Sequence, residues 1–256
     1  MTGSTNFDTK VVRGVTLRSD PAREHCFTIA HLHTEMRLSN DDSLSSQRDR
    51  LHRECNQEVL SVEIAAQCLV DFPEAPWELR LNLARQCWDE SRHAQLRWQR
   101  LIEIGGCKGE FPIINQEWGI VCMLDSLAAR LAVQNRLFEG GSLDVLRATI
   151  DEWKKAGDER TAEVTDAILV DEIQHVRFGN DWLRQLVAGN PRVLLEIAAG
   201  IDHAKRMMAA LVSRPGDLSA NGLALEGLRA QIKVNLVDRL AAGFTEQEIA
   251  RLGSEA

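Results

Sequence analysis

The sequence predicts an all-α protein built on a bundle of four long helices. Few Gly and Pro residues interrupt the stretch from residue 50 to residue 190, which leaves room for long helices. Apolar residues in this stretch recur at spacings of three, four and seven, which is the period of one helix face and not of a strand. At 256 residues the chain is long enough to bury a substantial core.

The first helix is predicted over residues 43–71. Asp42 or Ser43 is available as its N-cap, and Pro73 follows its end. One face of this helix is apolar, which favours packing against a partner helix. The apolar positions are Val59, Val62, Ala66, Leu69 and Val70.

The second helix is predicted over residues 77–104, antiparallel to the first. Gly105 and Gly106 follow it, and glycine takes the left-handed conformation of a helix C-terminus at little cost. The next ten residues, GCKGEFPIIN, span most of a bundle's length when extended at roughly 3.3 Å per residue. We therefore expect a crossover between the second and third helices.

Further helices are predicted over the rest of the chain. The third covers residues 115–139, Gly140 and Gly141 break it, and a shorter helix resumes at 143–155. The fourth begins at Gly157-Asp158 and reaches about residue 187. More helices are expected at 191–212, 222–242 and 245–252. The expected organisation is an irregular N-terminal extension (1–42), the bundle (43–189) and C-terminal helices that pack on it (190–256).

The composition narrows the range of partners. A net charge of −8 and a pI near 5.4 make nucleic acid an unfavoured partner, since gripping phosphates needs clustered Lys and Arg. The N-terminus lacks a signal-peptide layout and no apolar run could span a bilayer, so we expect a cytoplasmic protein that does not bind membranes. No C-x-x-C pair occurs among the six cysteines, which are expected to be reduced and mostly buried.

Two Glu-x-x-His motifs stand out in the predicted helices. Glu90 and His93 project from one helix face, and Glu172 and His175 do the same on another. A further glutamate precedes each motif at a nearly constant interval. Glu58 lies 32 residues before Glu90, and Glu139 lies 33 residues before Glu172. An antiparallel helix pair brings Glu58 level with Glu90.

Four carboxylates and two imidazoles form a donor set for two divalent ions. Two such ions repel each other and need several anionic ligands, and mixed oxygen and nitrogen donors suit iron or manganese. An aspartate precedes each motif glutamate, at Asp89 and Asp171. Because a metal-bound histidine usually donates its second ring N–H to a carboxylate, we expect these aspartates to orient His93 and His175.

These residues resemble the ferritin-like di-iron carboxylate superfamily, whose bundle site has this pattern. They are more closely similar to a ferritin-like family catalogued only as a domain of unknown function. The similarity covers residues 50–188 and rests on the stretches HRECNQEVLSVEIAAQ, FPEAPWE, DESRHA, EGGSLD and DEIQHVRFGNDWL. It implies a four-helix bundle with two iron ions, or one iron and one manganese. The ligands that it implies are Glu58, Glu90, His93, Glu139, Glu172 and His175.

The resemblance also implies an activity. The first expectation is a di-iron oxygenase or oxidase that uses dioxygen and an electron donor to hydroxylate or N-oxygenate a small organic substrate. The alternative is a ferroxidase or iron-binding protein without an organic substrate, and a tRNA-modifying hydroxylase is less favoured because the chain is acidic. A homodimer is compatible with each. The chain contains no tyrosine, which excludes a tyrosyl-radical role.

Several other residues are assigned by elimination. Glu63 is a possible substitute for Glu58, but it points about 140° away on the same helix. Trp88 is expected to pack, and His203 to pair with an acid outside the site. His31 and His33 are not expected to reach the metal. The charges of Arg97, Arg100, Lys154 and Lys155 are expected to be solvated.

Overall fold

The computed structural model describes residues 10–12, 15–17, 21–32, 35–36, 43–212 and 233–254. It confirms the all-α prediction, because long helices dominate this part of the chain. No helix within these ranges has the length and apolar character required to cross a membrane.

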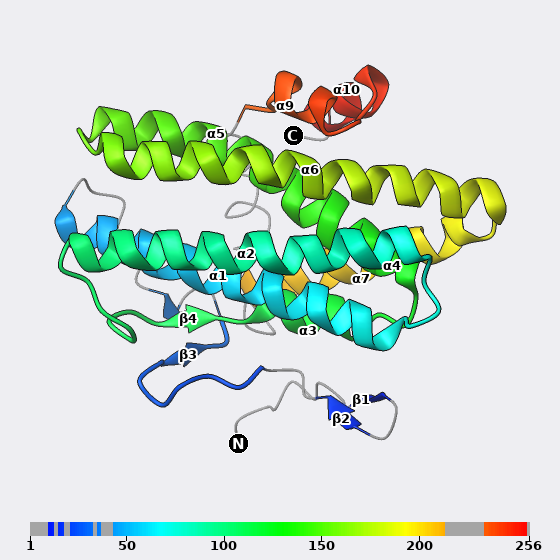
Figure 1. Ribbon diagram of the computed structural model, residues 1–256, viewed down its shortest axis with the longest axis horizontal. Helices are drawn as coiled ribbons and strands as arrows, with labels where there is room; N and C mark the ends of the chain where they lie inside the picture. Colours follow the sequence, from blue (N-terminus) through cyan, green and yellow to red (C-terminus); the bar gives the residue numbers. More distant parts are fainter. Residues whose placement is uncertain are drawn as a thin grey trace.

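Four long helical segments form the bundle (Figure 1). α1 and α6 run in one direction, whereas α2 and the third segment run in the other. The third segment is a continuous helix made of α4, η2 and α5. The bounds are α1 (Leu44–Asp71), α2 (Trp77–Glu103), α4 (Leu127–Leu131), η2 (Ala132–Glu139), α5 (Gly140–Lys155) and α6 (Glu159–Gly189).

Local signals set several helix ends as predicted. Ser43 caps α1 by accepting a hydrogen bond from the backbone N–H of Ser46. Asp158 caps α6 in the same way through Thr161. Gly105 takes a positive φ of 81° directly after α2, and Gly157 takes 78° before α6, which a residue with a side chain adopts only at a cost.

The crossover between α2 and the third segment travels the length of the bundle (Figure 1). It contains β4 (Ile113–Ile114) and α3 (Gln116–Cys122). β4 pairs in parallel with β3 (Ile29–Ala30), so the crossover is fastened to the N-terminal extension. The extension also contains the antiparallel pair of β1 (Lys10–Val12) and β2 (Val15–Leu17).

The predicted helix over 115–139 is wrong at its centre. Residues 123–126 are not helical, and Ser126 caps α4 by accepting from the N–H of Ala129. The buried Arg130 of α4 donates to the carbonyl group of Cys122, at the end of α3, and to that of Leu124, inside the interruption. These contacts hold the interrupted segment against α4.

The predicted break at Gly140-Gly141 is also wrong, because the helix runs through both glycines from η2 into α5. At Gly140 an added Cβ would lie 3.3 Å from the ring of Phe244. The first glycine therefore makes room for the C-terminal segment. Packing of the surrounding helices outweighs the weak helix propensity of glycine.

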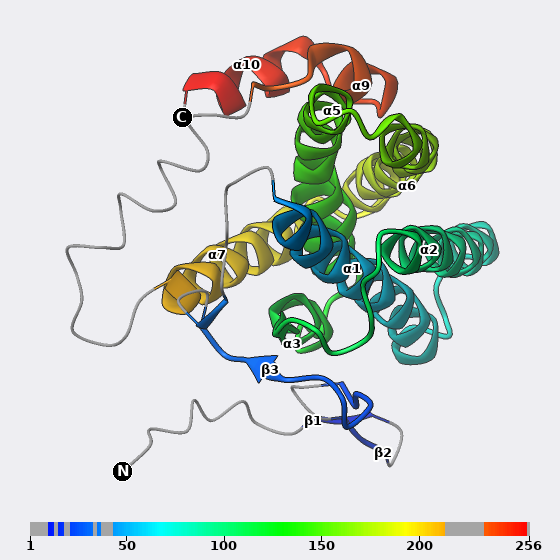
Figure 2. The same cartoon turned by 90° about the vertical axis from the view of Figure 1, so that its left-hand side faces the viewer.

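The C-terminal helices cover two faces of the bundle (Figure 2). α7 (Val193–Val212) lies against α4 and α3, whereas α9 (Leu236–Ala241) and α10 (Glu246–Ser254) lie over α5 and α6. The predicted helix over 222–242 is helical only at α9 within its described part, and residues 222–232 lie outside the described residues. The domain limits at residues 42 and 189 stay a prediction.

Candidate metal centre

All six predicted ligand side chains meet in the interior of the bundle. They form two groups of four, and within each group one ligand atom from every residue lies within 4.8 Å of the others. Glu90 and Glu172 belong to both groups. The first group adds Glu58 and His93, and the second adds Glu139 and His175. All six residues are buried.

The helix repeat explains the arrangement on α2. Gln86, Glu90, His93 and Arg97 are spaced by four, three and four residues, which places them on one helix face. All four are buried. The antiparallel packing of α1 against α2 then brings Glu58 to the same level.

Both histidine rings turn Nδ1 toward the carboxylates. Nδ1 of His93 lies 3.1 Å from Glu90, 3.5 Å from Glu172 and 3.7 Å from Glu58. Nδ1 of His175 lies 3.3 Å from Glu90 and 3.7 Å from Glu172. The two rings lie 6.1 Å apart between their centroids. The inward nitrogens and the carboxylate oxygens therefore surround a common space.

The aspartates that precede the motifs hold the histidines crosswise. Nε2 of His93 lies 3.2 Å from Asp171 on α6, and Nε2 of His175 lies 3.4 Å from Asp89 on α2. Each aspartate therefore orients the histidine of the other motif. Two arginines complete the pattern, because the exposed Arg85 donates to Asp89 and the half-buried Arg92 donates to both Asp171 and Asp89.

The sequence of this chain matches a family model described as "Protein of unknown function (DUF455)" over residues 4–250. The chain belongs to this family. The similarity seen in the sequence to a family known as a domain of unknown function is thereby confirmed, and it extends well beyond residues 50–188. No curated protein and no solved structure matches the chain. The family description carries no activity, so the chemistry of the DUF455 protein has to come from its own groups.

A π-helical segment shapes the surroundings of Glu139. η2 ends at this residue, and its i→i+5 hydrogen bonding widens the turn. In an α-helix Gln134 would point about 140° away from Glu139, yet in η2 both are buried and their side chains bond each other at 3.2 Å. Asn135 donates to the other carboxylate oxygen at 2.9 Å, and Gln86 donates from α2. Three neutral amides thus hold Glu139.

A buried arginine holds Glu58, and the expectation that Arg97 is solvated is wrong. Its side chain is 2% exposed. Nε donates to Oε1 of Glu58 at 2.5 Å, and Nη1 donates to Glu54. The signal was present in the sequence, because Arg97 lies one helical turn after His93 on the same face.

Without metal, the buried histidines of the cluster are cationic. Burial lowers the pKa of His93, but hydrogen bonds to Glu172, Glu58 and Glu90 outweigh it and raise that pKa to about 12. The pKa of His175 is raised well above its ordinary value in the same way, by hydrogen bonds to carboxylates that outweigh burial. Protons therefore supply the positive charge that the carboxylates need.

The four carboxyl groups divide into two kinds. Burial, followed by the charge of Glu172, raises the pKa of both Glu90 and Glu139. Burial also acts against ionisation of Glu58 and Glu172, but Arg97 lowers the pKa of Glu58, and hydrogen bonds from the histidines lower that of Glu172 to about 2. The cluster is therefore a site in which protons and a cation compete.

The donor atoms fit a metal ion. Oε1 of Glu90 and Nδ1 of His175 are fully buried and lie 3.3 Å apart, but their contact does not meet hydrogen-bond geometry. Buried polar atoms in proteins are nearly always satisfied, and a cation between these atoms would satisfy both. The buried acidic and histidine side chains could thus hold a metal ion, which is chemically suited to mixed carboxylate and imidazole donors.

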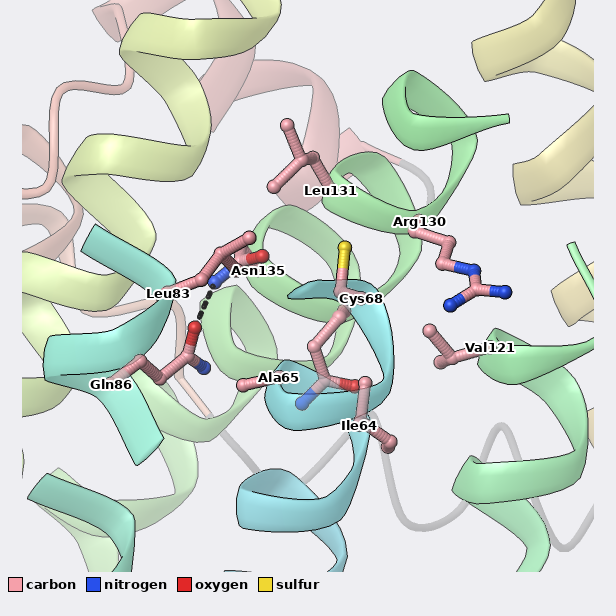
Figure 3. Close-up of a pocket in the computed structure, with 10 residues that line it drawn as sticks. Ile64, Ala65, Cys68, Leu83, Gln86, Val121, Arg130, Leu131 and Asn135 are labelled. Atoms are coloured by element: carbon pink, nitrogen blue, oxygen red, sulfur yellow. Dashed lines mark hydrogen bonds between the residues drawn. The ribbon is translucent and has the colours of Figure 1, made fainter. Parts of the chain in front are cut away.

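A small cavity adjoins the amides around Glu139 (Figure 3). Gln86 and Asn135, which are joined by a hydrogen bond of 3.2 Å, lie on one side of the cavity. The apolar part of its wall comes from Cys68, Leu131 and Val121. Its volume is about 10 Å³, which is room for about one water molecule.

An open groove reaches the centre from outside, between α2 and α6. Asp89, Asp171 and His175 contribute to it, together with the arginines Arg85 and Arg177. Its volume is about 330 Å³, at the lower end of the range for small-molecule sites.

Other predicted residues lie outside the cluster. The carboxylate of Glu63 accepts hydrogen bonds from Nη1 and Nη2 of Arg23, at 2.7 and 2.8 Å. This pair links the N-terminal extension to α1. His203 is not part of the cluster. We expected an acid to pair with it, but its buried Nε2 has no hydrogen-bond partner. His31 is exposed and His33 lies outside the described residues.

The expectation that Trp88 packs is wrong, because its side chain is 67% exposed on the outer face of α2. On α6, Val170 is also exposed, whereas Ile168, Leu169 and Val176 are buried.

One acidic group near the centre was not predicted. Glu117 lies on α3, and burial together with the charges of Glu58, Glu90 and Glu172 raises its pKa to about 7. Its position depends on how the crossover folds back on α1. Its distance in sequence from the motifs does not correspond to a shared helix face, so the sequence does not predict it.

Proposed function

We propose that this DUF455 protein is a dinuclear non-haem iron protein that activates dioxygen to oxidise a small organic substrate, by hydroxylation or amine N-oxygenation. The observation that carries the proposal is the sharing of Glu90 and Glu172 between two groups of buried ligands. Two carboxylates common to both groups are what two adjacent cations need in order to be held close together.

The donor set supports iron with open coordination positions. Each group offers three carboxylates and one imidazole, and a six-coordinate ion would keep about two positions for water or dioxygen. When bound, a reduced iron pair supplies the electrons that dioxygen chemistry needs. Manganese in place of one iron is compatible with the same donors.

The protein's own residues have distinct tasks in this proposal. Asp89 and Asp171 fix the rings of His175 and His93 so that both Nδ1 atoms face inward. The amides of Gln86 and Asn135 hold the carboxylate of Glu139. These contacts keep the ligand atoms in place before metal arrives, which lowers the cost of binding.

The groove between α2 and α6 supports a small organic substrate of limited size, with Asp89 and His175 among its lining residues. Oxygen insertion also consumes two electrons beyond those that the substrate provides, so the proposal includes a separate electron donor.

The second candidate is a ferroxidase or iron-binding protein without an organic substrate. The cavity beside Glu139 favours it, because about 10 Å³ admits water or a diatomic molecule and no organic substrate. A tRNA-modifying hydroxylase is less favoured, since the net charge of −8 opposes binding to phosphates.

A turnover assay with iron and oxygen separates the oxygenase from the iron-oxidising protein. Metal-free protein is loaded with ferrous iron and exposed to oxygen, with and without a library of small amines and acids. Oxygen consumption that a library member accelerates, with an oxidised product detected by mass spectrometry, supports the oxygenase. Ferric iron that accumulates equally without any library member supports iron oxidation instead.

Ligand variants test the metal centre itself. Glu172→Ala and His175→Ala should each abolish binding of two irons per chain, measured by metal analysis, while helicity by circular dichroism persists. Glu63→Ala is the matched control, because this glutamate lies on α1 and pairs with Arg23 outside the cluster. Two irons bound in both ligand variants would refute the assignment.

A further inference from the structure

The two metal positions have the same ligand types but different surroundings. We call them the Glu58 position (Glu58, His93 and the shared pair) and the Glu139 position (Glu139, His175 and the shared pair). The shared pair is Glu90 and Glu172. Any difference between the positions must therefore come from what contacts the unshared ligands.

The groups behind the histidines differ only at the surface. His93 is held by Asp171, which pairs with Arg92, and His175 is held by Asp89, which pairs with both Arg85 and Arg92. The additional arginine, Arg85, is 67% exposed, so solvent screens its charge. The histidine side therefore distinguishes the two positions only weakly.

The unshared glutamates differ in charge environment. Glu58 accepts a hydrogen bond from the guanidinium of Arg97, a full cation whose side chain is 2% exposed. Glu139 accepts hydrogen bonds only from neutral amides among the described residues, those of Gln86, Gln134 and Asn135. Besides the histidine that each position contains, a buried positive charge thus stands beside the Glu58 position and not beside the Glu139 position.

This charge acts against a second cation. Charges interact strongly inside a protein, where the effective dielectric constant is far below that of water. Glu54 accepts from the other end of the guanidinium and offsets part of its charge, but Glu54 does not belong to either ligand group. Arg97 also occupies Oε1 of Glu58, which leaves Oε2 as the oxygen that faces His93.

We propose that the two positions fill in order, the Glu139 position first and the Glu58 position second, and that Arg97 is the positioning residue that sets the difference in affinity. The inference rests on the proposed function, because it requires that the cluster binds two ions. It concerns the protein's affinity for each ion and is independent of the reaction that follows.

The test is a titration of the metal-free full-length chain with Mn²⁺ under argon, with free ion measured by electron paramagnetic resonance. We expect two steps whose dissociation constants differ by about tenfold or more. A crystal grown with one equivalent of Mn²⁺ should show anomalous density at the Glu139 position. Two equal steps, or first density at the Glu58 position, would overturn the order.

Variants of Arg97 identify the cause. Arg97→Gln removes the charge and keeps an amide donor for Glu58, so the second step should tighten by about tenfold while the first stays unchanged. Arg97→Lys keeps the charge and should leave the two steps apart. Arg100→Gln is the matched control on the same helix, because Arg100 pairs with Asp158 and Glu103 outside the cluster. A second step weakened by Arg97→Gln would overturn the role.

Glu54→Gln is a second variant for the same titration, in case Arg97→Gln does not fold. It removes the anion that offsets the guanidinium, so the second step should weaken, in the direction opposite to Arg97→Gln. A second step that is unchanged or tighter would refute the inference. Binding of no Mn²⁺ by the unaltered chain would refute the proposed function as well, whereas two equal steps would refute the order of filling alone.

Discussion

Raising the pH above 7 should destabilise the metal-free protein, and the reason lies in His93. Its pKa is about 12 in the folded state against an ordinary value of 6.5. A histidine whose pKa is raised by folding contributes stability that is fully present below about pH 6.5 and is lost as the pH rises toward the folded value.

The size of the effect follows from this shift. One pKa unit corresponds to about 1.4 kcal/mol, so between pH 7 and pH 8.5 His93 alone should cost about 2 kcal/mol of unfolding free energy. His175, whose pKa is also raised well above its ordinary value, acts in the same direction. The lowered pKa values of Glu58 and Glu172 do not oppose this, because both groups are ionised in either state throughout this range.

The assay is thermal unfolding followed by circular dichroism at pH 7 and pH 8.5. A loss of about 2 kcal/mol should lower Tm by roughly 4 to 8 °C in a chain of this size. Saturating Mn²⁺ should reverse the trend, because metal takes the place of the protons and binds more tightly as pH rises. The gap in Tm between metal-loaded and metal-free protein should therefore widen with pH.

Two variants test whether His93 causes the pH dependence of Tm. His93→Gln should make the pH dependence of Tm shallower in the metal-free protein, and the part that remains comes from His175. His203→Gln should leave it unchanged, because His203 lies outside the cluster and its pKa is lowered, chiefly by burial. A metal-free Tm that stays level or rises from pH 7 to pH 8.5 would refute the account of the cluster as one held together by protonated histidines.

Two further predictions concern the residues that support the centre. Gly179→Ala should destabilise the fold by about 1 to 3 kcal/mol and weaken metal binding, because the added Cβ would lie 2.5 Å from Cβ of Asn135, whose amide holds Glu139. Gly189→Ala is the control on the same helix, because an added Cβ there meets open space, and it should be neutral or slightly stabilising. Both variants are compared by thermal unfolding and metal titration. Equal losses in the two variants would show that the contact between Gly179 and Asn135 is not the cause. Asp89→Asn should lower metal affinity by roughly 10 to 100-fold, and crystals of that variant should show a turned ring at His175, the histidine of the opposite motif. A turned ring at His93 instead would show that the aspartates act within their own helices.

The motif residues were predictable because their geometry is local. A spacing of three or four residues places two side chains on one helix face whatever the rest of the chain does, so Glu90 with His93 and Glu172 with His175 are paired by the helix repeat alone. The N-cap at Ser43 and the glycine after α2 are local in the same sense.

The groups around the motifs were harder to predict, because the same pattern allows a side chain to be buried or solvated. Arg97 falls on the motif face, yet charged side chains are rarely buried unless paired, and its partners Glu54 and Glu58 come from another helix. Trp88 shows the converse, since a large apolar residue is normally packed, but its position on α2 faces away from the bundle.

The sequence by itself determined the all-α class, most helix ends and the two motifs, because these depend on contacts within a few residues. Only the tertiary structure decided that the helix passes through Gly140, that η2 turns Gln134 toward Glu139, and that an arginine is buried at one metal position and amides at the other. Local preferences are worth about 1 kcal/mol or less per residue, whereas packing and burial of charge act across the whole bundle and outweigh them.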